Sequence, residues 1–262
     1  MGTETGNARK FFEELFQGRE NLEKVLKLLR QLLKALRIAL PVIGFPMLAF
    51  GGWLALAWVP AERDMGAPSR IMYAHVPAVW MMFLCCVLNF GASIWYLAGK
   101  PSLKVDAMAE AGAEVCLVFG VIGVLLGSIW ARPTWGVYWN WDPRLTSVTV
   151  MLVTYAAMMA ARRFEEDPDR RARVSAVLGI LAAASAVLVW FSVKWFNSLH
   201  QVQSSPKTTY PELVVTLRWN SFAFLFIAAW FVWERYELAL KARAGEVAPP
   251  EPPPAPAEGG VA

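Results

Sequence analysis

The residues best suited to chemistry gather in one stretch, from Trp135 to Ser147. It contains three tryptophans and a tyrosine within seven positions, followed by Asp142 and Arg144, and Trp130 stands five positions upstream. Trp and Tyr favour the membrane–water boundary, which would account for one or two such rings. Four rings at alternating and i,i+4 spacing favour instead a surface for a large, flat, apolar ligand, whose polar ends the flanking charges would hold.

The chain has only two histidines, His75 and His200. A single histidine at the end of a membrane span is usually a boundary residue that is hydrated by water. By the topology derived below, however, both lie on the same side as the aromatic stretch. An iron porphyrin takes two axial nitrogen ligands, usually neutral imidazoles, within apolar and aromatic surroundings. A zinc site would need three or four closely spaced ligands, and the sequence on this side supplies no such cluster.

Each charged residue beside the aromatic stretch has both a structural and a ligand-binding interpretation. Asp142 followed by Pro143 is the pattern of a helix start, because Asp is a preferred N-cap and Pro is favoured at the first helical position. Arg70, Arg132 and Arg144 fall on the same side, and the arginine fork matches the two propionates of a porphyrin. Contact with lipid headgroups is the alternative for each arginine.

Several classes of function lack their sequence signals. There is no glycine-rich phosphate loop with a lysine, so ATP hydrolysis would belong to another chain. No nucleophile–base pair stands out, and the near absence of charge within spans disfavours an ion-coupled transporter. The net charge of +4 comes from loops that flank spans, so nucleic acid is not an expected partner. The cysteines read as inert core residues within apolar spans: Cys85, Cys86 and Cys116.

The elements that must position these residues are membrane helices. Hydrophobic residues make up 56% of the chain, and they come in blocks long enough to cross a bilayer. The sequence predicts an all-α integral membrane protein, a bundle of six transmembrane helices with the Trp-rich segment 130–147 as an external loop between spans 3 and 4. The expected spans are 42–59, 71–98, 113–131, 145–161, 174–196 and 219–233.

The distribution of positive charge predicts the orientation. Six spans place both termini on one side, and most of the 25 Lys and Arg residues fall on that side. Because positively charged loops stay in the cytoplasm, the termini are expected inside. The Trp-rich loop, His75 and His200 are then expected outside, on the periplasmic face of a bacterial inner membrane.

Three regions follow from these patterns. Residues 1–40 form a basic extension in which leucines and cations occupy opposite helical faces, a pattern typical of helices on the cytoplasmic leaflet. Docking of a partner subunit is the alternative for this extension. Residues 41–236 form the membrane domain. Residues 237–262 are expected to be a disordered, cytoplasmic, Pro- and Ala-rich tail.

These residues resemble a known family. The aromatic motif is similar to the tryptophan-rich "WWD" signature of haem-handling proteins in cytochrome c biogenesis, and within that superfamily the chain most resembles the CcmC family. The motif residues are Trp135, Gly136, Trp139, Trp141, Asp142, Arg144, Leu145, Thr146 and Ser147. The segments around His75 and His200 fit the family as well, and the resemblance covers roughly residues 42–235.

The resemblance implies a specific role. Proteins of the CcmC family hold haem b transiently and without a covalent bond on the periplasmic face, and present it to a membrane-anchored haem chaperone, CcmE. They associate with an ATPase and permease pair, CcmA and CcmB, and with a small membrane subunit, CcmD. By position, His75 and His200 would be the axial ligands of the iron, and Arg70 would lie near a propionate. The haem platform would comprise Trp130, Trp135, Trp139, Trp141, Asp142 and Arg144.

Other functions stay open at this level. A haem lyase that joins haem directly to apocytochrome c would also have to recognise a CxxCH segment, and such relatives usually carry extra domains. A haem-conducting permease would need ligands at the midplane or the inner side, whereas both histidines are expected outside. A purely structural membrane subunit is the remaining alternative.

Overall fold

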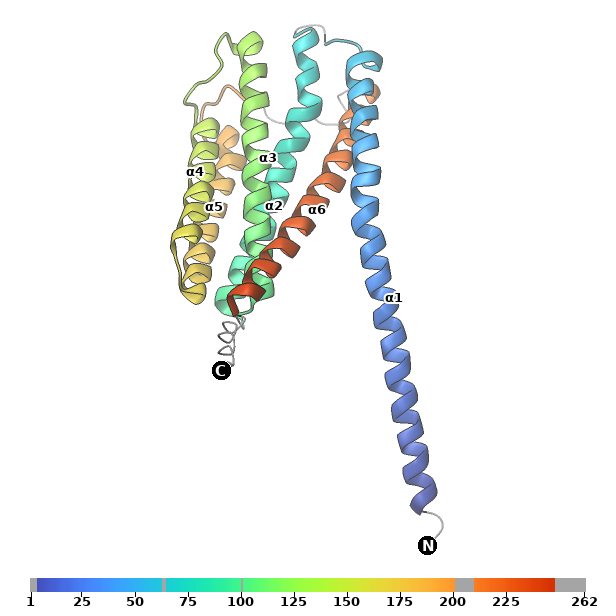
Figure 1. Cartoon of the computed structure of the whole chain (residues 1–262). Coiled ribbons are helices and arrows are strands. Elements are labelled where there is room, and N and C mark those ends of the chain that lie inside the picture. The colour runs from blue at the N-terminus through green and yellow to red at the C-terminus, as the bar shows by residue number, and fades with distance from the viewer. Residues whose placement is uncertain (1–3, 63–64, 100, 201–209, 248–262) are drawn as a thin grey trace, which may run out of the picture. The chain divides into compact units, whose positions relative to one another are not determined.

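The computed structural model describes residues 4–62, 65–99, 101–200 and 210–247, and in these residues every regular element is a helix (Figure 1). The long helices are α1 (Glu4–Trp53), α2 (Met72–Ala98), α3 (Leu103–Trp135), α4 (Pro143–Phe164), α5 (Pro168–Trp195) and α6 (Pro211–Val247). Two short elements, the π-helix η1 (Leu54–Trp58) and the 3-10 helix η2 (Ala67–Ile71), lie between α1 and α2.

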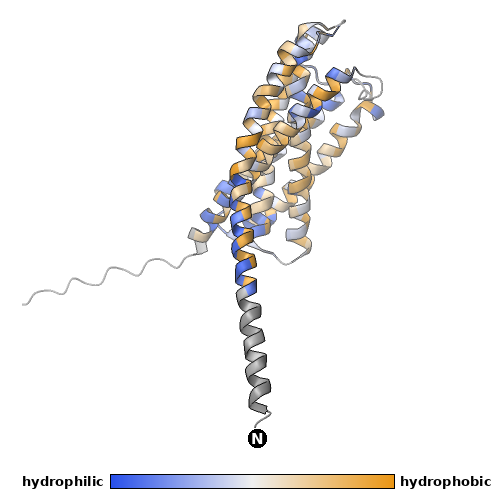
Figure 2. Ribbon diagram, turned by 90° about the vertical axis from the view of Figure 1, so that its right-hand side faces the viewer, coloured by the Kyte–Doolittle hydropathy of each residue, from blue (hydrophilic) through white to orange (hydrophobic). Residues whose placement is uncertain are grey.

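Each of the six long helices contains a stretch that is long and apolar enough to cross a membrane. Figure 2 shows hydrophobic residues along most of the helices and hydrophilic residues concentrated towards helix ends. The prediction of an all-α membrane protein with six spans is therefore confirmed. Helices suit the hydrocarbon core because nearly all of their backbone hydrogen bonds are made within the segment.

The chain divides into two compact units. Unit 1 comprises residues 1–78 and 204–231, and unit 2 comprises residues 79–203 and 232–262. Helices α2 and α6 are therefore each divided between the two units.

In unit 1, α1 packs against the first part of α6 through polar and aromatic contacts. Trp219 Nε1 donates to the carbonyl of Met47 at 2.8 Å, and Asn220 Nδ2 donates to the carbonyl of Gly51 at 3.2 Å. The Phe45 and Trp230 rings meet edge to face, 5.9 Å between centroids. These contacts fix the register between two helices that are distant in the sequence.

Helix α1 joins the basic extension and the first span into one continuous helix. It passes through Pro41 and Pro46 without a break and ends in η1, where the N–H of Val59 donates to Leu54 O at 3.0 Å. The division predicted near residue 40, between a basic extension and the membrane domain, therefore falls within a single helix. A proline removes one helix hydrogen bond, which weakens the helix at that point without ending it.

In unit 2, small residues bring α2 and α3 close together. A Cβ on Gly112 of α3 would lie 3.0 Å from the backbone nitrogen of Asn89 on α2, so only glycine fits without movement. Asn89 Nδ2 donates to the carbonyl of Ala109 at 2.7 Å, and Tyr155 of α4 donates to Asn89 Oδ1 at 3.3 Å. Close backbone approach and interhelical hydrogen bonds are the usual basis of helix association in membranes. The three cysteines are buried and free in this unit.

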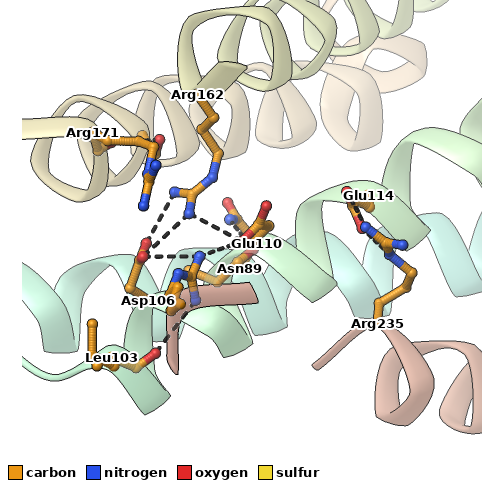
Figure 3. A network of polar contacts seen from close by, with 11 residues as sticks. Asn89, Leu103, Asp106, Glu110, Glu114, Arg162, Arg171 and Arg235 are labelled. Atoms are coloured by element: carbon orange, nitrogen blue, oxygen red, sulfur yellow. Dashed lines mark hydrogen bonds and ion pairs between the residues drawn. The ribbon is translucent and has the colours of Figure 1, made fainter. Parts of the chain in front are cut away.

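Figure 3 shows a buried ion network near the start of α3, whereas the aromatic stretch begins at the other end of this helix. Arg162 of α4 donates to both Asp106 oxygens, at 3.0 and 3.2 Å, and to Glu110 at 3.0 Å. Arg243 of α6 contacts Asp106 at 2.9 Å and also pairs with Glu110. Asp106, Arg162 and Arg243 are only 5%, 7% and 4% exposed. The network therefore joins three helices around two carboxylates.

Around this network, the structure differs from the sequence predictions in three places. Residues 99–112, which lie between the predicted spans 71–98 and 113–131, are helical from Leu103. Arg162, which follows the predicted span 145–161, is buried at the end of α4. Residues 237–247, expected to be disordered, continue α6 as helix. Ion pairing explains all three, because the paired charges allow polar helix turns to be buried. Residues 1–3, 201–209 and 248–262, including the rest of the predicted tail, lie outside the described residues.

We predict that Arg162→Ala lowers the free energy of unfolding by about 3–5 kcal/mol, because it leaves buried carboxylates without a partner. The neighbouring Arg163 is exposed and provides a matched control, since Arg163→Ala should change stability by no more than about 0.5 kcal/mol. Unfolding by SDS from mild detergent, followed by circular dichroism, measures both. Equal losses in the two variants would show that the network does not stabilise the fold.

Candidate functional site

The aromatic stretch begins on a helix and continues as a turn. Helix α3 extends to Trp135, so Trp130 and Arg132 are helical, although the sequence placed the end of span 3 at residue 131. Gly136 ends the helix with φ 79°, in the left-handed region that glycine adopts at little cost, and its N–H donates to Arg132 O at 3.0 Å. Arg132 in turn donates to the carbonyl of Gly136, and its guanidinium lies 5.8 Å from the Tyr138 ring centre. Arg132 thus stabilises the turn.

Asp142 starts α4, as its sequence predicted. The N–H of Leu145 donates to Asp142 Oδ1 at 2.8 Å, and Pro143 occupies the first helical position. A negative charge at a helix N-terminus also interacts favourably with the helix dipole.

The second oxygen of Asp142 holds the segment that follows α5. Oδ2 accepts from Ser198 Oγ at 2.7 Å and from the N–H of Leu199 at 3.2 Å, and it lies 3.2 Å from Nδ1 of His200. We call Asp142 and residues 198–200 the Asp142 latch. Sequence reasoning found Asp142 and His200 but missed Ser198 and Leu199, because nothing local marks a contact across more than fifty residues.

The latch orients the imidazole of His200. The side chain is 21% exposed, and the Trp135 ring meets it edge to face with 4.8 Å between centroids. An ionised carboxylate can only accept, so Nδ1 carries the proton and Nε2 keeps its lone pair. A carboxylate that fixes the tautomer of a histidine in this way is the usual outer partner of a metal-ligating imidazole.

Burial and charge set the ionisation of the latch. Burial alone would raise the pKa of Asp142, but hydrogen bonds from Leu145, Ser198 and His200 outweigh it and lower the pKa below its ordinary value. Burial lowers the pKa of His200 below its ordinary value, although Asp142 opposes the shift. At pH 7 the pair is therefore a carboxylate beside a neutral imidazole.

Two further tryptophans lie on the turn beside the latch. Trp139 and Trp141 meet edge to face, 5.4 Å between centroids at 83°. Trp141 is 69% exposed, whereas Nε1 of the half-buried Trp139 is buried and has no hydrogen-bond partner among the described residues. The turn thus offers an exposed aromatic face and an unused donor.

Arg144 lies in the first turn of α4. It is half-buried, and its Nε donates to the carbonyl of Val189 on α5 at 3.3 Å. The structure therefore gathers most of the predicted site residues within unit 2, on α3, the turn and α4, with His200 from the segment after α5.

The two other predicted site residues belong to unit 1. Arg70 lies on η2 and donates through Nη2 to Val59 O at 3.4 Å, while its buried Nε has no partner among the described residues. His75 lies near the start of α2 and is half-buried.

Comparison with known proteins identifies the family. The family model described as Heme exporter protein C, CcmC, matches residues 21–248. The chain belongs to the CcmC family. The resemblance read from the Trp-rich motif is confirmed, and the match begins earlier than the predicted residue 42, so it includes part of the basic extension.

Curated relatives agree with this assignment. Heme exporter protein C of Bradyrhizobium diazoefficiens is 41% identical over 149 residues, 56% of this chain and 56% of the relative. Heme exporter protein C of Escherichia coli K12 is 34% identical over 184 residues, 68% of this chain and 73% of the relative. A ccmC-like mitochondrial protein of cytochrome c biosynthesis from Marchantia polymorpha is 32% identical over 170 residues, 64% of this chain and 72% of the relative.

We predict that Asp142→Asn loosens the latch while it preserves the helix start. Asn caps a helix about as well as Asp, but its amide would face the donors of Ser198 and Leu199. The free energy that holds residues 198–200 in place should fall by about 1–3 kcal/mol. This loss should be seen as faster amide hydrogen exchange in residues 196–200.

Asp167→Asn provides the matched control, because Asp167 caps α5 in the same manner but is exposed and, among the described residues, binds no second segment. That variant should exchange like the unmodified protein. Unchanged exchange in residues 196–200 of Asp142→Asn would contradict the latch.

Proposed function

We propose that this protein holds haem beside its Trp-rich segment and passes it to a membrane-anchored, CcmE-like haem chaperone during cytochrome c maturation. One observation carries the proposal. In a chain of the CcmC family, the Asp142 latch presents a neutral His200 whose Nε2 keeps its lone pair, in contact with Trp135 at the start of a turn that also carries the exposed Trp141. A neutral imidazole with its other nitrogen hydrogen-bonded to a carboxylate suits a haem iron.

His75 supplies the second axial ligand in this proposal. It is the one other histidine of the chain, so a bis-histidine site has no alternative candidate. Two imidazoles give six-coordinate iron with both faces occupied. Delivery requires this ligation to be weak enough for a ligand from the chaperone to replace one histidine.

The aromatic residues would hold the porphyrin ring. Trp135 contacts His200 and would lie nearest the iron, whereas Trp139 and Trp141 would pack on the ring from the turn. Trp130, on α3 five residues before Trp135, would add a further ring to this apolar wall. Because Trp141 is largely exposed, one edge of the haem would stay accessible to the chaperone.

Arginines would bind the two propionates. Arg70 is the strongest candidate, since its Nε is a buried donor without a partner among the described residues. Arg144 is a second candidate, half-buried, with its Nε donating to Val189 O. Arg132 is the weaker candidate, because a propionate would compete with the Gly136 carbonyl for its guanidinium. The free Nε1 of Trp139 is a further donor that such a carboxylate could use.

The membrane orientation and the partner subunits are inferred from the distribution of charge and from the absence of an ATP-binding motif. The Lys and Arg bias supports cytoplasmic termini in the bacterial inner membrane and a periplasmic haem site. Because the sequence has no ATP-binding motif, the energy for export would come from an ATPase and permease pair, and a small membrane subunit would complete the assembly, as the family resemblance implies.

Two other functions make different demands. A haem lyase would attach haem to apocytochrome c without a chaperone, and a haem-conducting permease would bind haem at ligands inside the bundle. A permease does not explain why His200 is fixed beside an exposed aromatic turn. A lyase would in addition have to recognise the CxxCH segment of apocytochrome c, whereas delivery to a chaperone requires only an accessible haem.

The test of haem binding is an absorption spectrum of the purified protein with pyridine haemochrome quantitation. We predict a low-spin, bis-histidine spectrum that each of His75→Ala and His200→Ala converts to high-spin or loses, because each removes one axial nitrogen. Added imidazole should restore the low-spin spectrum.

Ser198→Ala is the control for this experiment, since it weakens the latch but keeps both histidines. It should retain low-spin haem. Identical spectra in all variants would rule out these ligands, and an absence of haem even after its addition would overturn the proposal.

A second test measures the transfer of haem to the purified soluble domain of the chaperone. Trp141→Ala should slow haem transfer or weaken haem binding roughly tenfold, since a well-packed tryptophan is a typical binding hot spot. Trp195→Ala is the control, because Trp195 is similarly exposed but stacks on Phe191 at the end of α5. Direct attachment of haem to apocytochrome c without the chaperone would favour the lyase instead.

A further inference from the structure

The N-terminal helix is longer than a membrane span. Helix α1 has 50 residues, which at 1.5 Å per residue is about 75 Å, whereas a hydrocarbon core is about 30 Å thick. If the span ends with η1 at Trp58, about 20 residues cross the core, and the helix before residue 38 lies outside it. We call residues 21–37 the basic arm.

The basic arm is exposed to its surroundings along its length. Every residue from 21 to 36 is exposed, so no other part of the described chain covers it. Its apolar side chains recur at helical spacing on one face, and each is at least 42% exposed: Leu22, Val25, Leu26, Leu29, Leu32, Leu33 and Leu36. An apolar stripe of this length in water would be unfavourable, so it requires a partner.

The other face of the arm selects the partner. Lys24, Lys27, Arg30 and Lys34 lie on the polar side, and there is no acidic residue between 24 and 40. Leucines on one face and cations on the other match the boundary of an anionic membrane, with apolar residues among the acyl chains and cations at the phosphates.

The arm also begins where such a surface is available. It is the direct continuation of the first span, so the headgroups of that leaflet lie next to it at high effective concentration. Pro41 stands at the junction, and the missing helix hydrogen bond there makes a bend less costly than elsewhere in α1. A protein partner would have to displace this surface.

We propose that the basic arm binds anionic phospholipid headgroups of the leaflet in which the first span begins, by bending at Pro41 to lie along the membrane. Its apolar face then enters the headgroup–acyl boundary, and its cations contact phosphates. This interaction does not depend on haem binding.

Site-directed spin labelling of the full chain in nanodiscs tests the proposal. One label replaces Leu29 on the apolar face, and another replaces Gln31 on the polar face. The native cysteines are buried and free, so the unmodified chain serves as the labelling blank. In discs that contain phosphatidylglycerol, the label at 29 should be more accessible to oxygen than to a water-soluble nickel complex. The label at 31 should show the reverse.

Two comparisons test whether the positive charges of the basic arm cause this difference in accessibility. The preference at position 29 should be lost in discs of phosphatidylcholine alone and in the variant Lys24→Gln, Lys27→Gln, Arg30→Gln, Lys34→Gln. It should persist in Lys104→Gln, Arg163→Gln, which removes exposed cations elsewhere. These substitutions are all at exposed positions, and gel filtration checks that the fold is kept.

Three results would overturn the proposal. Access of the nickel complex to position 29 in both lipids would place the arm in water. Protection of position 29 from both reagents would indicate a protein partner, and spin–spin broadening would identify that partner as a second copy of the chain.

Discussion

The Asp142 carboxylate is the interaction on which the candidate site depends. One oxygen caps α4 and the other binds the segment that carries His200, so a single side chain sets both the end of the aromatic turn and the position of the imidazole. A carboxylate is the one common side chain that accepts on both oxygens and is charged at pH 7, which explains why the chain uses Asp here rather than Asn. The same charge fixes the tautomer of His200.

Features set by local sequence could be predicted. The six spans followed from hydrophobic blocks, and the helix start at Asp142 followed from a capping residue before proline, because these signals act within a few residues. The histidines were found as candidates because the chain has only two. Ser198 could not be found, since its contact with Asp142 depends on how α4 and α5 end in space and a single serine after a span has no distinctive signal.

The helical turns beyond the predicted spans were missed for a related reason. Hydropathy treats Asp106, Arg162 and Arg243 as residues that belong in water, and each was placed in a loop or a tail. Their mutual pairing lowers the cost of burial, so α3 begins earlier and α6 ends later than hydropathy allows. A pairing between residues 106 and 243 is not visible in either segment alone.

Helix α3 connects these observations. Asp106, Glu110 and Glu114 near its start are ion-paired to α4 and α6, while its last turns carry Trp130 and Trp135 into the aromatic turn. A helix held at one end by charge pairs and along its length by contacts such as Gly112 with Asn89 is a stiff support. An exposed aromatic turn can keep a defined shape only on such a support, because exposed loops otherwise gain little from packing. The ion network that hydropathy missed thus anchors the helix on which the site is built.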